Sequence, residues 1–334
     1  MDFKKDFFRL NEWWNVKVSL FFGIFTMYAL HYKIDFIEYG SIVIECFLVF
    51  FPIAAWANVV NDFGDIESDK LANKPNRLAT WSKTQQVLLT FGFVPLLFIV
   101  PQMYGYPFQW YLFIGLTILA FYLYSVKPFR FKSDGWKGVF MDALATQVFP
   151  MLFIIQRIQS EVKQENLLVF VPLAIWLLAS GLRLHMVHQY MDVENDKRAG
   201  LKTLFTSYEK PYIDKVVSRI IFPIEIVFFV INLMVLQQYW FVFALLIYGI
   251  VQFLLKRNFK IKHSLYAVNK ENRIILSEYY NYYILFFSLL IASIYISSMY
   301  LIPLISFMIL FFYFYWPNLK ELLHILRTYS QNRS

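Results

Sequence analysis

The sequence has almost no cysteine and no segment typical of a flexible linker. Only one of its 334 residues is cysteine, Cys46, which stands inside an apolar run. A disulfide framework and a metal site built on cysteine are therefore excluded. Charged residues make up 16% of the chain, and no low-complexity tract or linker rich in glycine or serine interrupts it. The composition does not predict soluble domains joined by linkers.

Apolar residues are abundant instead. They make up 59% of the sequence, compared with about 45–50% in an ordinary soluble domain, and the mean hydropathy is +0.49. The apolar runs are continuous and often seventeen residues or longer. Such runs are typical of membrane-spanning helices, whereas the strands of a β-barrel alternate in hydropathy. The sequence predicts an all-α, polytopic transmembrane helical bundle.

Nine to ten spans are expected. The stretch 279–316 is too long for one crossing, because as a helix it would extend about 57 Å against a hydrocarbon core of roughly 30 Å. We divide it at Pro303, and its second part could lie in the interface instead. The first apolar run lacks a small-residue cleavage site, so we expect an uncleaved span and not a signal peptide. The spans are placed near residues 17–33, 41–60, 86–101, 108–125, 138–156, 167–190, 217–237, 239–256, 279–298 and 301–316.

Positive charge is concentrated on one side of the expected membrane. If the N-terminus is cytoplasmic, the cytoplasmic segments hold 25 of the 31 lysines and arginines. An excess of this kind orients a membrane protein, and it accounts for the net charge of +8 without a nucleic-acid partner. We expect a protein of the cytoplasmic (inner) membrane. Its basic segment Lys256–Glu278 is expected to lie along the membrane surface.

Two nine-residue stretches hold five of the eleven aspartates of the chain. In each stretch, polar side chains recur every four residues. On a helix this spacing places three side chains on one face, spread over roughly 12 Å at about 1.5 Å per residue. The residues are Asn61, Asp65 and Asp69 in the first stretch, and His188, Asp192 and Asp196 in the second.

Corresponding positions of the two stretches differ by 127 residues in every case, which indicates an internal duplication. We treat residues 1–334 as a single integral-membrane domain. It has two pseudo-repeats, about 17–125 and 138–256, followed by the C-terminal spans 279–316. Both stretches then end a span on the cytoplasmic side. Their equal orientation and surface position argue against an ion-coupled transporter, in which inverted repeats bind ions near the midplane.

Carboxylates at the ends of neighbouring spans suit Mg²⁺. This ion prefers oxygen ligands and is usually bound through one or two carboxylates together with substrate phosphates. Basic residues near both stretches would suit a diphosphate leaving group, whose apolar chain would run between helices rich in phenylalanine and tyrosine. These basic residues are Lys74, Arg77, Lys127, Arg130, Lys132, Lys197, Arg198 and Lys202.

Three segments resemble signatures of the UbiA superfamily of intramembrane prenyltransferases. The first is Asn61-Asp62-Phe63-Gly64-Asp65 with Asp69 and Asn73-Lys74-Pro75-Asn76-Arg77. The second, from Asp192 to Thr203, looks like the pattern D-x-E-x-D-x-x-A-G-x-x-T. Between them, Leu123–Lys132 with Gly135–Gly138 is similar to a loop of the chlorophyll- and homogentisate-type branches. The resemblance covers spans one to eight, and its motifs follow the expected order.

The resemblance implies helices around a central cavity and a polyprenyl diphosphate held through Mg²⁺. Ionisation of the allylic C–O bond would give a carbocation that alkylates an acceptor, and aromatic faces could stabilise this cation. The implied metal ligands are Asp65, Asp69, Asp192 and Asp196. The implied diphosphate contacts are Asn61, Arg77, Arg130, Lys132 and Lys202. The catalytic candidates are Asp62, His188 and Lys127.

Departures from the family pattern concern the acceptor. His188 stands where the family usually has asparagine or aspartate, and it could act on the acceptor as a base. Lys127 lies three residues after Tyr124, so the Tyr-x-x-x-Lys element of some members is off register. We expect an aromatic or quinone-type acceptor. A UbiA-type terpene cyclase, which needs no acceptor, and an ion-coupled transporter stay open as alternatives.

Several polar residues fall within the expected spans. Glu225 lies deepest, and we expect it to face the cavity because isolated charges are costly in a membrane. Asp142 and Arg183 lie near the cytoplasmic edge, where snorkelling or mutual pairing would satisfy them. His185 is expected to be a hydrogen-bonded interfacial histidine. The tyrosines of 279–283 are expected to form an interfacial belt.

Overall fold

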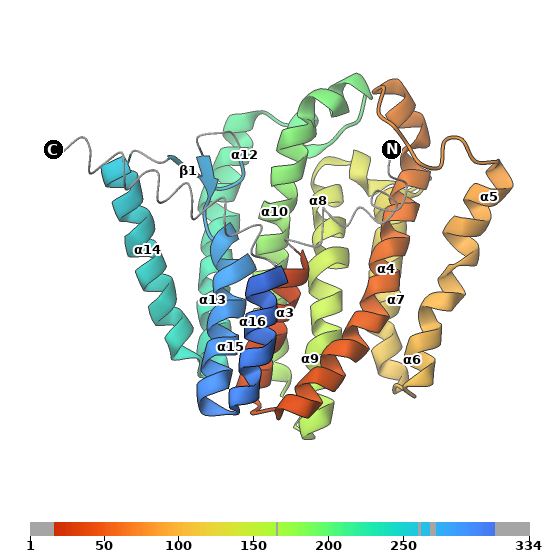
Figure 1. Ribbon diagram of the computed structural model, residues 1–334. Helices are drawn as coiled ribbons and strands as arrows, with labels where there is room; N and C mark the ends of the chain where they lie inside the picture. The colour runs from red at the N-terminus through yellow and green to blue at the C-terminus, as the bar shows by residue number, and fades with distance from the viewer. Residues whose placement is uncertain (1–16, 165, 260–261, 268–271, 311–334) are drawn as a thin grey trace.

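The computed structural model describes residues 17–164, 166–259, 262–267 and 272–310. Its helices stand side by side in one bundle, with the α5–α6 segment and α14 at opposite edges (Figure 1). Residues 1–16 and the end of the expected span 301–316 lie outside the described residues. The helices are α3 (Ser19–His31), α4 (Phe36–Leu71), α5 (Lys83–Val87), α6 (Ile99–Met103), α7 (Phe108–Ser125), α8 (Gly135–Ala143), α9 (Phe149–Val162), α10 (Phe170–Arg198), α11 (Leu204–Ser207), α12 (Lys210–Val216), α13 (Phe222–Val235), α14 (Tyr239–Phe259), α15 (Ile284–Tyr295) and α16 (Leu301–Leu310).

Within the described residues, six helical segments are long and apolar enough to cross a membrane, and four shorter apolar helices accompany them. The predicted all-α polytopic bundle is therefore confirmed, and the chain is an integral membrane protein. The long segments are Phe36–Leu71, Lys83–Met103, Phe108–Ser125, Gly135–Val162, Leu167–Arg198 and Lys210–Val235. The shorter ones are Ser19–His31, Tyr239–Leu254, Tyr279–Tyr295 and Ser298–Ile309.

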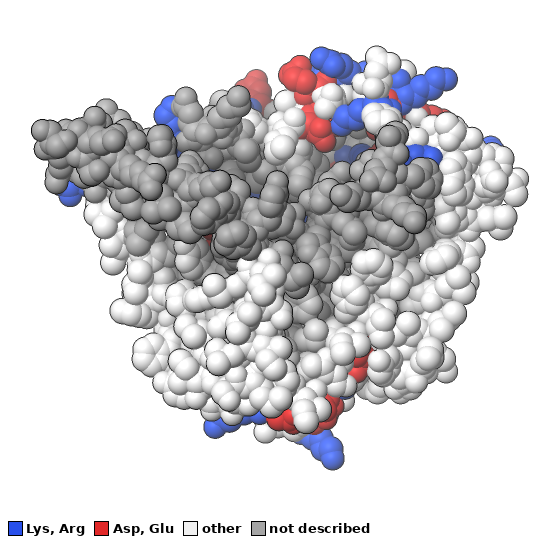
Figure 2. Space-filling model, in the orientation of Figure 1, with Lys and Arg blue, Asp and Glu red and all other residues white. Residues whose placement is uncertain are grey.

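The outer surface has the pattern of a protein that faces lipid. Charged side chains gather at the upper end of the bundle, with a smaller group at the lower end, and the visible side between them is almost free of charge (Figure 2). Large apolar side chains are exposed along α14, among them Phe243, Leu246, Ile250 and Phe253. A continuous apolar surface of this extent is unsuited to water but matches the hydrocarbon core.

Two long helical segments contain a π-helical turn just before a proline. The turns are Leu144–Val148, between α8 and α9, and Val217–Ile221, between α12 and α13. Pro150 and Pro223 follow them. Proline has no N–H to bond the carbonyl one turn earlier, and the wider turn accommodates this without ending the helix.

Glycine allows α4 and α8 to approach their neighbours closely. A Cβ atom on Gly64 of α4 would lie 2.1 Å from the carbonyl oxygen of Ser125, at the end of α7. A Cβ atom on Gly138 of α8 would lie 2.6 Å from the carbonyl oxygen of Phe131. Only glycine permits such contact with a neighbouring backbone. The loop between α7 and α8 is therefore held against the first acid-rich stretch.

The tyrosines of 279–283 are not all interfacial. Tyr279 and Tyr280 are 1% and 0% exposed. The ring of Tyr280 packs against Trp176 and Phe229, with centroids 5.5 and 5.3 Å apart. The prediction of an interfacial belt is wrong for these two residues, because their π-helical turn packs against α3 and both side chains are buried in the bundle.

A buried ion pair joins α10 to α13. Both Arg183 and Glu225 are fully buried. The guanidinium donates two hydrogen bonds to the carboxylate, at 2.6 and 2.7 Å, and a third to the carbonyl oxygen of Leu265 at 3.0 Å. The prediction that Glu225 faces the cavity is wrong, since a bidentate arginine already satisfies its charge.

The segment after α14 forms a short two-stranded parallel sheet. Strands β1 (Lys262–Ser264) and β2 (Asn272–Ile274) pair with His263 opposite Arg273. Tyr266, which follows β1, is buried against Tyr190 and Phe205 and donates a hydrogen bond of 2.5 Å to Asp214. Through Tyr266 this part contacts α10, α11 and α12. Its position along the membrane surface stays a prediction.

Candidate active site

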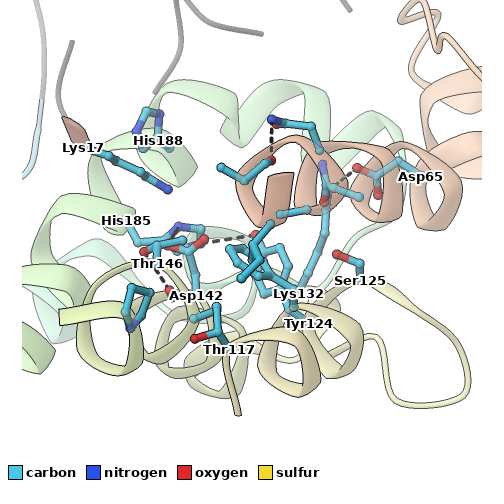
Figure 3. A pocket seen from close by; sticks show the side chains of 18 of the residues that line it. Lys17, Asp65, Thr117, Tyr124, Ser125, Lys132, Asp142, Thr146, His185 and His188 are labelled. Carbon is cyan, nitrogen blue, oxygen red and sulfur yellow. Dashed lines mark hydrogen bonds and ion pairs between the residues drawn. The ribbon is translucent and has the colours of Figure 1, made fainter. Parts of the chain in front are cut away.

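A cavity of about 800 Å³ lies within the bundle, between α3, α4, α7, α8–α9 and α10 (Figure 3). Its volume falls in the range of roughly 300–1,000 Å³ that is typical of small-molecule sites. One part of its wall is polar, and the rest is mainly apolar and aromatic. The polar part includes Asn61, Asp65, Asp69, Lys74, Lys132, Asp192 and Asp196. The aromatic part includes Phe21, Phe22, Phe25, Phe47, Phe50, Phe51 and Phe121.

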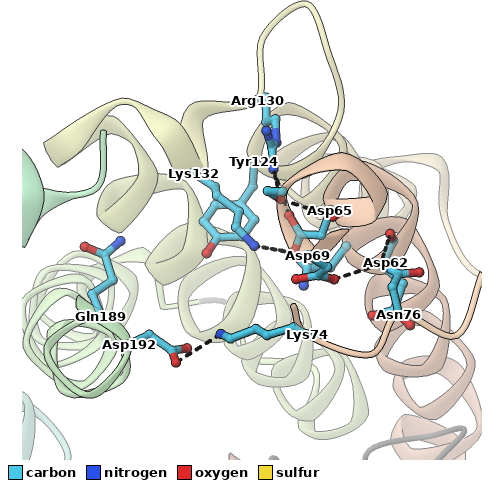
Figure 4. Close-up of polar contacts among 12 residues, drawn as sticks. Asp62, Asp65, Asp69, Lys74, Asn76, Tyr124, Arg130, Lys132, Gln189 and Asp192 are labelled. Carbon is cyan, nitrogen blue, oxygen red and sulfur yellow. Dashed lines mark hydrogen bonds and ion pairs between the residues drawn. The ribbon is translucent and has the colours of Figure 1, made fainter. Parts of the chain in front are cut away.

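Asp65 of α4 is held between two cations from the loop after α7 (Figure 4). It is 6% exposed. Arg130 donates to one of its oxygens at 3.0 Å, and Lys132 forms an ion pair with the other. Lys132 also lies 3.5 Å from the amide oxygen of Asn61. The loop therefore supplies the positive charge that permits a carboxylate to be buried here.

Asp69, one turn further along α4, is held by the loop that follows the helix. The side-chain amide of Asn76 donates to Asp69 and to the backbone carbonyl oxygen of Asp62, each at 2.8 Å. Arg77 forms an ion pair with the Asp62 carboxylate. Asp62 and Arg77 stand outside the set of described residues that line the cavity. Their contacts fix the shape of the loop around Asp69.

The second stretch, on α10, faces the same cavity. Lys74 extends from the loop after α4 and contacts Asp192 at 3.1 Å, so it connects the two stretches (Figure 4). Asn195 donates to the same carboxylate at 3.1 Å. Asp196 accepts a hydrogen bond of 3.0 Å from Thr203. The fourfold spacing thus brings both stretches to one site, as predicted.

The other predicted site residues are dispersed. Lys127 pairs with Glu67 at 2.7 Å, and both side chains are largely exposed. Lys202 lies with Lys127 in a separate surface hollow next to Tyr208. His188 lines the main cavity beside Lys17 (Figure 3). The catalytic and binding roles expected of these residues stay predictions.

The cavity wall also contains a polar group outside the two acid-rich stretches. The expected mutual pairing of Asp142 with Arg183 is wrong, because Arg183 bonds Glu225 instead. Asp142 of α8 and His185 of α10 lie 3.0 Å apart, and Tyr124 and Gln189 lie next to them. Each residue comes from a different turn or helix. His185 and Gln189 lie four residues apart on α10, but no spacing in the sequence relates them to Asp142 or Tyr124. The only signal was the presence of ionisable residues inside expected spans.

The site fits Mg²⁺ when phosphate oxygens complete its coordination. Asp65, Asp69, Asp192 and Asp196 offer carboxylate oxygens from two helices that face each other, and oxygen is the ligand that Mg²⁺ prefers. Among the described residues, no cluster of three or more histidine, cysteine, aspartate or glutamate side chains is arranged to hold a metal by itself. Substrate oxygens would therefore have to complete the coordination of an ion bound here.

The model of the UbiA prenyltransferase family matches residues 18–265 of this chain. The chain belongs to the UbiA prenyltransferase family. It is therefore an enzyme of the prenyltransferase class. The matched region begins just before α3 and ends just after β1, so it contains all the helices that line the cavity.

Two curated relatives carry the same name. The digeranylgeranylglyceryl phosphate synthase of Thermococcus sibiricus is 28% identical over 159 residues, which are 47% of this chain and 53% of that protein. The synthase of Methanocaldococcus jannaschii is 31% identical over 172 residues, which are 49% of this chain and 54% of that protein. The chain thus spans about half the length of the curated relatives it matches.

Solved structures of a UbiA homolog from Archaeoglobus fulgidus share the fold. The structure bound to DMAPP and Mg²⁺ has a TM-score of 0.52 at 17% identity, covering 84% of this chain and 98% of that one. The structure bound to GPP and Mg²⁺ has a TM-score of 0.50 at 18% identity, covering 87% and 98%. The bundle is therefore of the UbiA type.

Proposed function

We propose that this protein transfers an isoprenoid chain from a polyprenyl diphosphate to an acceptor, with Mg²⁺ as cofactor and at the cytoplasmic face of the membrane. One observation carries the proposal: the two acid-rich stretches, with Lys74 and Lys132, line the polar part of a cavity whose remaining wall is mainly apolar. A prenyl diphosphate likewise consists of a charged group and an apolar chain, which would match these two parts of the cavity. The DMAPP, GPP and Mg²⁺ bound by the homolog support this donor class.

The polar part of the cavity would bind the diphosphate. Asp65, Asp69, Asp192 and Asp196 would hold Mg²⁺, which, when bound, supplies positive charge for the leaving diphosphate. Lys74 and Lys132 now contact Asp192 and Asp65. In the complex they would contact phosphate oxygens as well, through charge-assisted hydrogen bonds. The reaction would therefore begin with a leaving group surrounded by cations.

The aromatic part of the cavity would hold the isoprenoid chain. Phe21 and Phe25 of α3, Phe50 of α4 and Phe121 of α7 line it. Their rings would exclude water, which would otherwise capture the allylic cation. Their faces also attract a cation, by as much as about 2 kcal/mol when it is desolvated. The donor would thus be ionised in an environment that protects the intermediate.

Two classes of acceptor fit the cavity. An aromatic or quinone-type acceptor suits the phenylalanine-rich wall. A glyceryl phosphate lipid is the second candidate, because both curated relatives are named as digeranylgeranylglyceryl phosphate synthases. Lys17 and His188, which line the cavity together, would suit its phosphate group. Either acceptor loses a proton when it is prenylated.

Product analysis tests the proposal and separates the acceptors. Purified protein would receive geranyl, farnesyl or geranylgeranyl diphosphate, with Mg²⁺ or with EDTA. Each donor would be offered with an aromatic acid, a quinol, a geranylgeranylglyceryl phosphate or no acceptor. A prenylated product that needs both Mg²⁺ and one acceptor class supports the proposal. A cyclic hydrocarbon formed without acceptor would instead identify a terpene cyclase.

A further inference from the structure

A second polar group, which includes His185 and Asp142, lies in the cavity wall (Figure 3). His185 precedes Asp192 by two turns of α10, or about 10 Å along the helix axis. Its Nδ1 atom lies 3.0 Å from Oδ2 of Asp142, and the two side chains are 9% and 16% exposed. Both residues line the cavity. A carboxylate and an imidazole are thus paired next to the substrate space.

Hydrogen bonds around Gln189 determine the tautomer of His185. The amide oxygen of Gln189 accepts a hydrogen bond of 3.1 Å from the backbone N–H of Leu204, so its NH₂ group faces His185. The distance between that nitrogen and Nε2 of His185 is 3.2 Å. An NH₂ group can only donate, so Nε2 must be the unprotonated acceptor. The ring proton is then on Nδ1, directed at Asp142.

We propose that His185, oriented by Asp142, is the general base that removes the proton of the acceptor during prenyl transfer. In this step the C1–O bond of the donor breaks and its electron pair leaves with the diphosphate. The nucleophilic atom of the acceptor forms a bond to C1, and its proton passes to Nε2 of His185. The acceptor takes the position at Nε2 that the Gln189 amide holds in the substrate-free protein. This inference rests on the proposed function.

The surroundings favour His185 over His188 for this role. The carboxylate of Asp142 stabilises the imidazolium that forms on His185, as in a catalytic triad. His188 instead lies beside the ammonium group of Lys17 (Figure 3). The phenol of Tyr124 on α7 also faces His185, at 3.5 Å from Nε2. The reacting carbon would lie where the diphosphate meets the chain, between the acid-rich stretches and the phenylalanines.

The test is the partition of products in a His185→Gln variant. It would be assayed with geranylgeranyl diphosphate and the acceptor that the unchanged protein prenylates. Loss of a general base lowers such a rate by about 10²- to 10⁴-fold. We expect the prenylated product to fall by this factor, and geranylgeraniol, formed when water captures the cation, to become the main product. Asp142→Asn should shift the ratio in the same direction.

Three results would overturn the inference. One is an unchanged ratio of prenylated product to alcohol in His185→Gln, even if both decrease, because that indicates a structural role. Another is full transfer activity in this variant. The third is a shifted ratio in His188→Gln but not in His185→Gln. If His185→Gln does not fold, as judged by size exclusion in detergent, the ratio is measured on Asp142→Asn, and an unchanged ratio there would equally overturn the inference.

Two comparisons make the result specific. His263→Gln is the matched control, because His263 lies in β1 outside the cavity and bonds Gln252 at 2.7 Å. It should leave the ratio of prenylated product to alcohol unchanged.

The protein without substitution separates the failure of the proposed function from the failure of the role of His185. If it releases no diphosphate with any donor, the proposed function fails. If it transfers normally while His185→Gln keeps the same ratio, only the role of His185 fails.

Discussion

At the scale of single residues, the site is organised by lysines that reach acids on other elements. Lys132 contacts Asp65 from the loop after α7, and Lys74 contacts Asp192 from the loop after α4. Each lysine neutralises a carboxylate in the absence of substrate and lies where a diphosphate would bind. The same side chains would therefore preserve the site when it is empty and hold the donor when it is full.

This double role predicts the effect of Lys74→Met. A hydrogen bond to a charged group contributes about 1.5–3 kcal/mol, so the KM for the prenyl diphosphate should rise roughly 10- to 100-fold. Steady-state kinetics with varied donor would measure it. Lys215→Met, at an exposed position of α12, is the control for loss of one positive charge. An unchanged KM in Lys74→Met would remove this lysine from the diphosphate site.

At the scale of helices, close approach at Gly64 fixes α4 against α7. In Gly64→Ala the new Cβ would lie 2.1 Å from the Ser125 carbonyl oxygen, so the backbones must move apart. Overpacking of this kind lowers the free energy of unfolding by about 1–3 kcal/mol. We expect a lower unfolding temperature in detergent. Gly40→Ala is the matched control on the same helix, since its Cβ would meet no described atom within 4 Å. Equal unfolding temperatures for both variants would contradict this account of the contact.

The buried ion pair between α10 and α13 predicts a second effect on stability. Arg183→Met would leave Glu225 buried without its partner, which costs about 3–5 kcal/mol. Adding Glu225→Leu to the same chain should restore most of the stability, because no buried charge then remains. Thermal unfolding of both variants would show the difference. A double variant as unstable as the single one would show that the pair is needed for packing and not for charge balance.

At the scale of the whole molecule, the distribution of charge predicts the orientation in the membrane. The chain is suited to thiol labelling because its one cysteine, Cys46, is buried. We expect Lys197→Cys to react with a membrane-impermeant maleimide only from the cytoplasmic side, and Lys163→Cys only from the other side. If labelling in sealed vesicles shows the opposite pattern, the proposed orientation in the membrane is wrong.

Much of the bundle could be predicted from the sequence, because hydropathy follows directly from the need to cross lipid. The fourfold spacing also placed Asp65 and Asp192 on helix faces that meet at one cavity. Hydropathy does not tell which helices are neighbours. The partners Arg183–Glu225 and Asp142–His185, and the burial of Tyr280, depend on that information. The pseudo-repeats 17–125 and 138–256 stay a prediction.

Diphosphate release is the most direct test of the central claim, that the two acid-rich stretches form one Mg²⁺-dependent site. Released diphosphate would be measured with geranylgeranyl diphosphate and a membrane lipid extract as the source of acceptor. We predict release that EDTA abolishes and that both Asp65→Asn and Asp192→Asn lower at least about 100-fold. Glu161 lies in the last turn of α9 and is not among the residues that line the cavity. Glu161→Gln should therefore release diphosphate at the rate of the unchanged protein. Release that persists in EDTA, or in either aspartate variant, would contradict the account.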